Sequence, residues 1–140
     1  DKADMIPVKA PKKARTQDNR TVFIIQDGEC TAIRKRPEKG LLAGLYELPN
    51  TQGHLKSEDA LLYVKELGFD PLYIEELPPA KHIFSHIEWR MQAYRIKVSS
   101  LKTTQDKKLI FVSKEQSGKQ YAIPSAFGAY AKYIKEETTR

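Results

Sequence analysis

A buried strand that leads straight into a tight turn is the feature that most constrains the fold of this chain. Residues Thr21 to Gln26 are β-branched or apolar up to the last position, which is typical of a strand in a core. Asp27-Gly28 follows directly and favours a hairpin, because such a turn requires positive φ angles. We therefore expect the fold to begin near Thr21, with a returning strand from Cys30 to Lys35.

Later segments alternate between strand and helix patterns. Ser57 can cap a helix that runs to about Leu67, and Gly68 is a natural stop. This alternation predicts an α+β fold with a mixed β-sheet sandwiched between helices. A last helix is expected from Pro124-Ser125, and further strands are expected at 72–77, ended by Pro78-Pro79, and at 81–85, 88–98 and 109–112.

Apolar side chains in these segments define an expected core. The first helix should bury a stripe at helical spacing, and the last helix should do the same. Large side chains in the longest strand are expected inside as well. The residues concerned are Leu61, Val64 and Leu67, then Trp89, Met91 and Tyr94, and finally Phe127, Tyr130, Ala131 and Ile134.

The charge of the chain favours a polyanionic partner. It has 24 Lys and Arg against 18 Asp and Glu among 140 residues, a net charge of +6, which favours nucleic acid. Residues 1–19 are rich in basic residues and prolines and are predicted to be a basic interdomain linker, with a folded domain at 20–140. Lys9, Lys12 and Lys13 are candidate DNA-backbone contacts, with a solvated tail as the alternative.

Cysteine usage and hydropathy indicate the compartment. The single cysteine, Cys30, cannot form an intramolecular disulfide or a multi-cysteine metal site, which favours a reducing, intracellular setting. Cys30 itself is expected to be a small core or surface residue. No apolar run approaches the roughly 20 residues of a membrane helix. We expect a monomer in the cytoplasm, with no membrane partner.

The Gly-rich loop and the helix after it carry a family resemblance. The hairpin, the loop, Leu45-Tyr46-Glu47-Leu48-Pro49 and a helix ending in Leu-Gly resemble the Nudix (MutT-like) fold. In active members that helix ends in Arg-Glu-x-x-Glu-Glu-x-Gly. With Gly68 as the final glycine, Leu62 and Lys65 replace glutamates and Glu66 alone is acidic. Magnesium needs several oxygen ligands, so we expect no metal site and no pyrophosphate hydrolysis.

A narrower resemblance rests on three blocks. Ile33-Arg34-Lys35-Arg36-Pro37, residues 40–49 and Phe84-Ser85-His86 are similar to the carboxy-terminal domain of MutY, over roughly residues 20–140. MutY enzymes are adenine DNA glycosylases that act at adenine mispaired with 8-oxoguanine. The resemblance implies a non-catalytic, cofactor-free domain for base excision repair that recognises the lesion in double-stranded DNA. A catalytic domain of the same chain, with a 4Fe-4S cluster, would remove the adenine at nucleoid DNA.

Phe84, Ser85 and His86 are the predicted lesion-binding loop. Guanine presents N7 as an acceptor, whereas oxidation at C8 makes N7 a donor and adds O8 as an acceptor. A serine hydroxyl both accepts and donates, so Ser85 is expected to read the two atoms together. Phe84 would wedge against the base stack or pack the loop down, and His86 would contact a phosphate or hold the loop. The alternative is an ordinary turn with Phe84 in the core.

Three more residues are candidate DNA-backbone contacts. Arg34 and Arg36 form a basic cluster at a strand end, and Lys81 precedes the predicted loop. The alternative for such charges is solvated surface.

Two other functions stay open for the chain: an active Nudix nucleotide pyrophosphohydrolase with unconventional ligands, or a structural or protein-binding module. No catalytic residue is expected in this chain, and a zinc site at His82 and His86 is not expected.

Overall fold

The computed structural model describes residues 15–28, 30–40, 42–84, 86–113 and 124–135. Within these ranges three strands have 12 or 13 residues, and the other four have two to six. Two α-helices and two short 3-10 helices complete the described elements. They are β1 Thr16–Asp27, β2 Cys30–Lys35, β3 Tyr46–Glu47, β4 Asn50–Gln52, α1 Ser57–Glu66, β5 Pro71–Ile83, β6 Ile87–Val98, η2 Leu101–Thr103, β7 Leu109–Ser113, η3 Ser125–Phe127 and α3 Gly128–Lys135.

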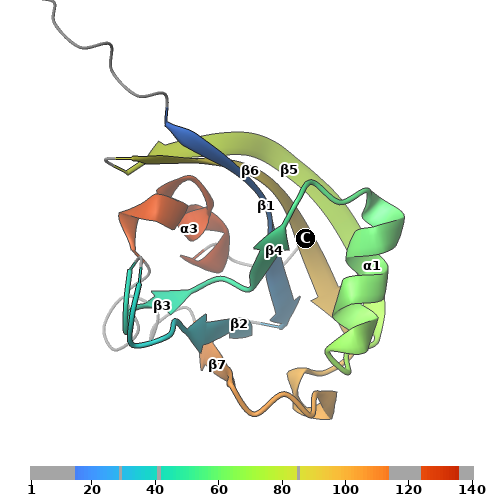
Figure 1. Ribbon diagram of the computed structural model, residues 1–140. Coiled ribbons are helices and arrows are strands. Elements are labelled where there is room, and N and C mark those ends of the chain that lie inside the picture. Colours follow the sequence, from blue (N-terminus) through green and yellow to red (C-terminus); the bar gives the residue numbers. More distant parts are fainter. Residues whose placement is uncertain (1–14, 29, 41, 85, 114–123, 136–140) are drawn as a thin grey trace, which may run out of the picture.

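The strands form one mixed sheet, as predicted. Its order is β3-β2-β1-β6-β5, with β4 paired to β1 and β7 paired to β2. The pairing of β1 with β6 is parallel, and the other pairings are antiparallel. Figure 1 shows α1 and α3 on opposite sides of the curved sheet. The predicted sandwich of a mixed sheet between helices is therefore confirmed.

The second half of strand β1 is buried on both faces, because each face of the sheet has a helix over it. All six residues from Thr21 to Gln26 are buried, so this part of the strand reads as a continuous apolar run. Val22 and Ile24 face the core under α3, whereas Phe23 and Ile25 face the core under α1. The expected core residues of β6, η3 and α3 are confirmed as buried, apart from the half-buried Ala131: Trp89, Met91, Tyr94, Phe127, Tyr130 and Ile134.

The start of β1 differs from the prediction near Thr21. The strand begins at Thr16, so residues 16–19 belong to the sheet and not to a linker. Their side chains are mostly exposed and polar, which hides the strand in the sequence. Their backbone pairs in parallel with β6, beginning with Thr16 opposite Ile87. Residues 1–14, with Lys9, Lys12 and Lys13, lie outside the described part of the chain.

Strand β5 also differs from the prediction. Pro78-Pro79 was expected to separate two strands, but β5 runs from Pro71 to Ile83 without interruption. It is an edge strand, and its pairing with β6 shifts register between Leu77 and Ala80. Proline lacks a backbone donor and is tolerated at an edge strand or a bulge, so both prolines fit here.

Helix α1 ends as predicted but begins differently. Gly68 follows the helix with φ +98°, the left-handed conformation that glycine adopts readily. Thr103 and Thr104 donate hydroxyl hydrogen bonds to the carbonyls of Gly68 and Leu67. At the start, Lys56 occupies the N-cap and provides no side-chain cap, so the expected cap at Ser57 is wrong. The buried residues are Ala60 and Val64, with Leu61 and Leu67 half-buried.

Candidate nucleic-acid interface

The connection between β5 and β6 is tied down on both sides. The backbone N–H of Phe84 donates to the carbonyl of Ile87 at 2.7 Å. The carbonyl of His86 accepts from the N–H of Thr16 at 3.0 Å, which attaches the connection to β1. Phe84 is half-buried and His86 is exposed, whereas Ser85 lies outside the described residues. The described flanks of the predicted lesion loop are therefore fixed to the sheet.

Trp89 is the side chain on which Phe84 packs. The two rings meet edge to face with their centroids 5.1 Å apart, and His82 meets Phe84 in the same way at 4.6 Å. Trp89 is only 2% exposed and also touches Phe127 of η3, with centroids 5.6 Å apart. Rings in these arrangements attract each other beyond simple area burial. The loop flank is thus joined to the core under α3.

Two arginines lie against the same tryptophan. The guanidinium carbons of Arg20 and Arg36 each lie 5.6 Å from the centroid of the Trp89 ring. This is within the range of a cation–π interaction. Arg20 comes from β1 and Arg36 follows β2, so Trp89 connects the loop flank to two other parts of the sheet. Composition alone does not predict that these two arginines lie against Trp89.

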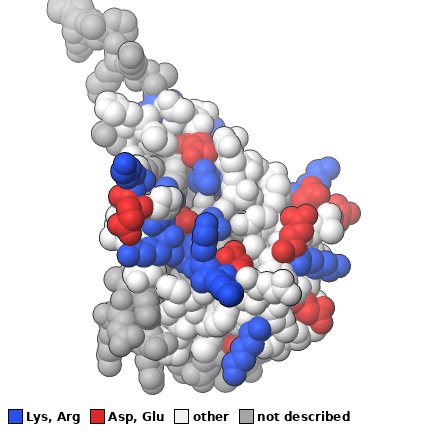
Figure 2. All heavy atoms as spheres, turned by 60° about the horizontal axis from the view of Figure 1, so that its bottom comes forward, with Lys and Arg blue, Asp and Glu red and all other residues white. Residues whose placement is uncertain are grey.

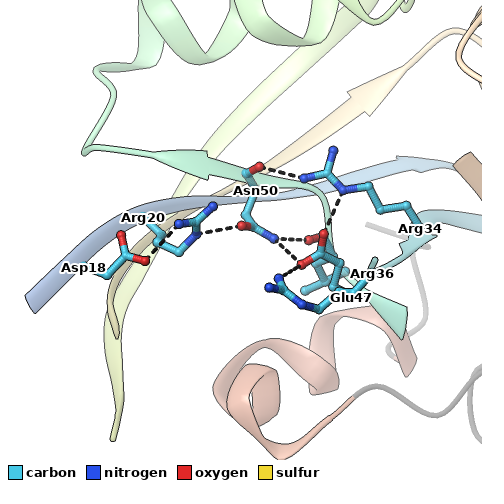
Figure 3. Close-up of polar contacts among 7 residues, drawn as sticks. Asp18, Arg20, Arg34, Arg36, Glu47 and Asn50 are labelled. Atoms are coloured by element: carbon cyan, nitrogen blue, oxygen red, sulfur yellow. Dashed lines mark hydrogen bonds and ion pairs between the residues drawn. The ribbon is translucent and has the colours of Figure 1, made fainter. Parts of the chain in front are cut away.

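The arginines belong to a polar network centred on Glu47, which Figure 3 shows. The Glu47 carboxylate accepts hydrogen bonds from Arg34 Nε at 2.8 Å and from Arg36 Nη1 at 2.6 Å. Asn50 Nδ2 donates to the same carboxylate at 2.9 Å, and Asn50 Oδ1 accepts from Arg20 Nε at 2.8 Å. Arg20 also pairs with Asp18 at 3.0 Å. The network links β1, β2, β3 and β4.

Electrostatics keep the centre of this network ionised. Burial alone would raise the pKa of Glu47, but hydrogen bonds from Arg34, Asn50 and Arg36 and the Arg34 charge outweigh it, so the pKa lies below its ordinary value. Burial opposes the charge of Arg34 too, yet the hydrogen bond and charge of Glu47 raise its pKa. Glu47 is 4% exposed, so its charge depends on these partners.

The network bears on the predicted DNA-backbone contacts. The side chains of Arg34 and Arg36 are 25% and 17% exposed, and both guanidinium groups bind Glu47. Their role in the structure is to neutralise this carboxylate, and a phosphate contact by either stays a prediction. Lys81 is exposed on β5 near the loop. Figure 2 shows Lys and Arg side chains gathered on one face of the molecule with acidic side chains among them.

Helix α1 presents few ligands for a cation. Leu62 is 56% exposed, and Lys65 and Glu66 are exposed as well. Glu58 and Asp59 lie in the first turn, at the other end of the helix, where their negative charges interact favourably with the helix dipole. One carboxylate beside a lysine does not fit Mg²⁺, which takes several oxygen ligands. Within the described ranges, no three His, Cys, Asp or Glu residues group as metal ligands.

Sequence reasoning missed the polar network, because the strands β3 and β4 that hold Glu47 and Asn50 were not expected. The missed residues are Arg20, Glu47 and Asn50, and Trp89 was expected only as a core residue. Only Glu47 could have revealed the network from the sequence, because a carboxylate between Tyr46 and Leu48 in an apolar segment needs a cationic partner when it is buried.

In the part of the chain that the structure describes, no helix is long and apolar enough to cross a membrane.

Solved structures similar to this one include a repair domain and hydrolases. The carboxy-terminal domain of mouse MUTYH, solved in complex with human PCNA, is 20% identical with a TM-score of 0.63, over 84% of this chain and 86% of that chain. A Nudix hydrolase from Nitrosomonas europaea is 13% identical with a TM-score of 0.60, over 84% and 88%. A MutT structure from work on Aliivibrio salmonicida and Vibrio cholerae is 16% identical with a TM-score of 0.54, over 86% and 98%.

The comparison with protein families agrees with these structures. At such identities the structural similarity shows the fold, which repair domains and hydrolases share. The family model described as a NUDIX domain matches residues 21–133, which is most of the chain. The match includes the sheet from residue 21 onward, all of α1, most of α3, the glycine loop before β3 and the glycine that ends α1. The chain therefore belongs to the Nudix domain family.

Proposed function

We propose that this chain is the 8-oxoguanine-recognition domain of an adenine DNA glycosylase and hydrolyses no nucleotide itself. Its partner is double-stranded DNA with 8-oxoguanine opposite adenine. A separate glycosylase domain of the same polypeptide excises the adenine and holds the 4Fe-4S cluster. The protein acts as a monomer at cytoplasmic, nucleoid-associated DNA.

The observation that carries the proposal is the way the β5–β6 connection is held. Phe84 packs on a buried tryptophan, and the carbonyl of His86 is bound by the first residue of β1. A recognition group is effective when its position is set before binding, because less ordering is then required. Ser85 lies between these two fixed residues in the sequence.

The chemistry of the lesion matches a serine between fixed flanks. The N7–H of 8-oxoguanine donates a hydrogen bond to the Ser85 hydroxyl, and the same hydroxyl donates to O8. With guanine in this position, the N7–H donor is absent and a buried polar group loses its partner. Such a loss costs roughly 1–3 kcal/mol, or about tenfold to a hundredfold in affinity.

A binding measurement with matched serine variants tests this role. Fluorescence anisotropy of the chain with duplexes carrying 8-oxoguanine or guanine opposite adenine should show a preference of about tenfold to a hundredfold for the lesion. Ser85→Ala should abolish most of the preference. Ser99→Ala, at an exposed position after β6, should retain it. Equal binding of both duplexes by the unmodified chain, or an unchanged preference in Ser85→Ala, refutes the proposal.

Nucleotide hydrolysis is the second candidate, favoured by the similarity to MutT and other Nudix hydrolases. The residues of α1 argue against it, since Leu62 and Lys65 stand where the active family motif has glutamates. Incubation of the chain with 8-oxo-dGTP and Mg²⁺ separates the two functions. We expect no release of pyrophosphate above the background of the buffer, and steady metal-dependent release would establish the hydrolase instead.

A further inference from the structure

A group of charged side chains lies on the opposite face of the β5–β6 hairpin from Phe84 and Trp89. Lys81 is directly opposite Arg90 in the antiparallel register, and Ile83 is opposite Glu88. Directly opposed residues project to the same face of a sheet, and alternate residues along a strand share a face. Lys81, Arg90 and Glu88 therefore lie together, one strand position away from Trp89.

Arg15 adds a third positive charge from another part of the chain. It immediately precedes β1, whose first residue pairs with Ile87. The pKa of Glu88 lies below its ordinary value, mainly because Arg90 donates a hydrogen bond to its carboxylate. Burial raises this pKa by a smaller amount, and the positive charges of Arg90, Lys81 and Arg15 lower it further. All three cations thus act on one carboxylate, although they are far apart in the sequence.

The group carries more positive charge than Glu88 can neutralise. Arg90 Nε binds Glu88 at 2.8 Å, with the Arg90 side chain 48% exposed and that of Glu88 10% exposed. Lys81 and Arg15 are exposed. Like charges directly opposite each other on neighbouring strands destabilise a sheet, so the Lys81–Arg90 pair opposes folding unless an anion is near. Glu88 supplies one negative charge against three positive charges.

We propose that Arg15, Lys81 and Arg90 bind the phosphodiester backbone of double-stranded DNA beside the recognition loop. The inference rests on the proposed function and deepens it, because it names the groups that hold the duplex while the loop reads the base. Phosphate contacts position a protein on DNA without reading its sequence. Three cations supplied by three neighbouring segments at one end of the sheet suit a chain of phosphates better than one small anion.

This cluster differs from the arginines around Glu47. Arg34 and Arg36 are three-quarters or more buried and are engaged by an ionised, buried carboxylate. Arg90 is half exposed, and Lys81 lies directly across from it. Release of counterions from exposed cations is what drives backbone binding and makes it weaken as salt rises. The surplus charge of Arg15, Lys81 and Arg90 is available for that exchange.

A pair of double variants with equal charge tests the site. Lys81→Gln combined with Arg90→Gln should weaken binding roughly tenfold for both the lesion duplex and the undamaged duplex. The slope of log affinity against log salt should fall by about 2, one for each lost contact. The control is Lys107→Gln with Lys108→Gln, which removes the same charge at exposed positions before β7. It should change neither quantity appreciably.

A variant of opposite sign adds a second test. Glu88→Gln removes the only negative charge of the cluster, so both duplexes should bind several-fold more tightly. The backbone site is refuted if the Lys81/Arg90 variant binds like the control, if Glu88→Gln does not strengthen binding, or if the unmodified chain binds only an acidic protein and no duplex. Failure of lesion reading looks different, since binding and its salt dependence would persist without preference for 8-oxoguanine.

Discussion

Helix α1 and the end of the β5–β6 hairpin make different use of one scaffold. The helix has a well-formed C-terminus at Gly68, but its outer surface presents the apolar Leu62 and the cationic Lys65. The hairpin end has an aromatic anchor on Trp89, a backbone tie to Thr16 and a charged group on its other face. The two regions of this Nudix fold therefore differ in their chemistry: aromatic and basic side chains gather at the hairpin end, whereas the exposed surface of α1 mixes apolar, basic and acidic side chains.

The largest expected effect is at the aromatic anchor. Trp89→Ala should lower the free energy of unfolding by about 3–5 kcal/mol, because a large buried side chain leaves a cavity behind. Leu62→Ala on α1 should change it by less than about 0.5 kcal/mol, since Leu62 is exposed. Urea denaturation of both variants checks this contrast. Similar losses for the two variants would mean that the hairpin end is not the better-anchored region.

The polar network should give the next largest effect. Glu47→Gln keeps the shape of the side chain but leaves Arg34 and Arg36 without their counter-charge, so we expect a loss of about 2 kcal/mol. Glu66→Gln, at the exposed end of α1, should cost less than about 0.5 kcal/mol. Denaturation at neutral pH measures both. Equal costs would show that Glu47 is no more important for stability than a surface carboxylate.

A smaller effect follows from the lowered pKa of Glu47. A carboxyl whose pKa is lower in the folded state stabilises the fold at pH values above its unfolded pKa of about 4.3, and this contribution is lost as pH falls through the folded value. The stability difference between the unmodified chain and Glu47→Gln should therefore shrink between pH 5 and strongly acidic pH. A difference that grows on acidification would contradict the assigned ionisation.

The smallest effect is expected on α1. Lys65→Glu restores an acidic residue at one position of the family motif, on an exposed part of the helix. We expect a change in stability within about 0.5 kcal/mol. The preference for 8-oxoguanine should be unchanged, because in our proposal the β5–β6 connection reads the base and the helix does not. Anisotropy with both duplexes provides the measurement. A lost preference would move the recognition surface toward α1.

Local signals in the sequence were sufficient for much of the fold. The apolar run to Gln26, the turn at Gly28 and the stop at Gly68 each depend on a few neighbouring residues, and the structure confirms them. The start of β1 at Thr16 depends instead on pairing with β6, which neighbouring residues do not reveal. The passage of β5 through Pro78-Pro79 depends on its place at the sheet edge.

The residues of the candidate site also differ in whether local sequence signals could predict them. Phe84 and His86 were predicted as lesion-binding residues because their tripeptide resembles a family motif, and that role stays a prediction. Arg20, Glu47 and Asn50 were missed, and Arg34 and Arg36 were expected only as DNA-backbone contacts, because the buried charge is balanced across separate strands. Arg15 and Arg90 were missed as a pair with Lys81 because only the strand register brings them together. Such pairings require the tertiary structure.

An NMR titration of the labelled chain with a duplex carrying 8-oxoguanine opposite adenine tests the central claim most directly. Our account predicts that the largest amide shifts occur from Phe84 to His86, with smaller shifts near Lys81 and Arg90. The amides of α1 should hardly move, and guanine in place of the lesion should reduce the loop shifts. Shifts centred on α1, with Phe84 and His86 unchanged, would contradict it.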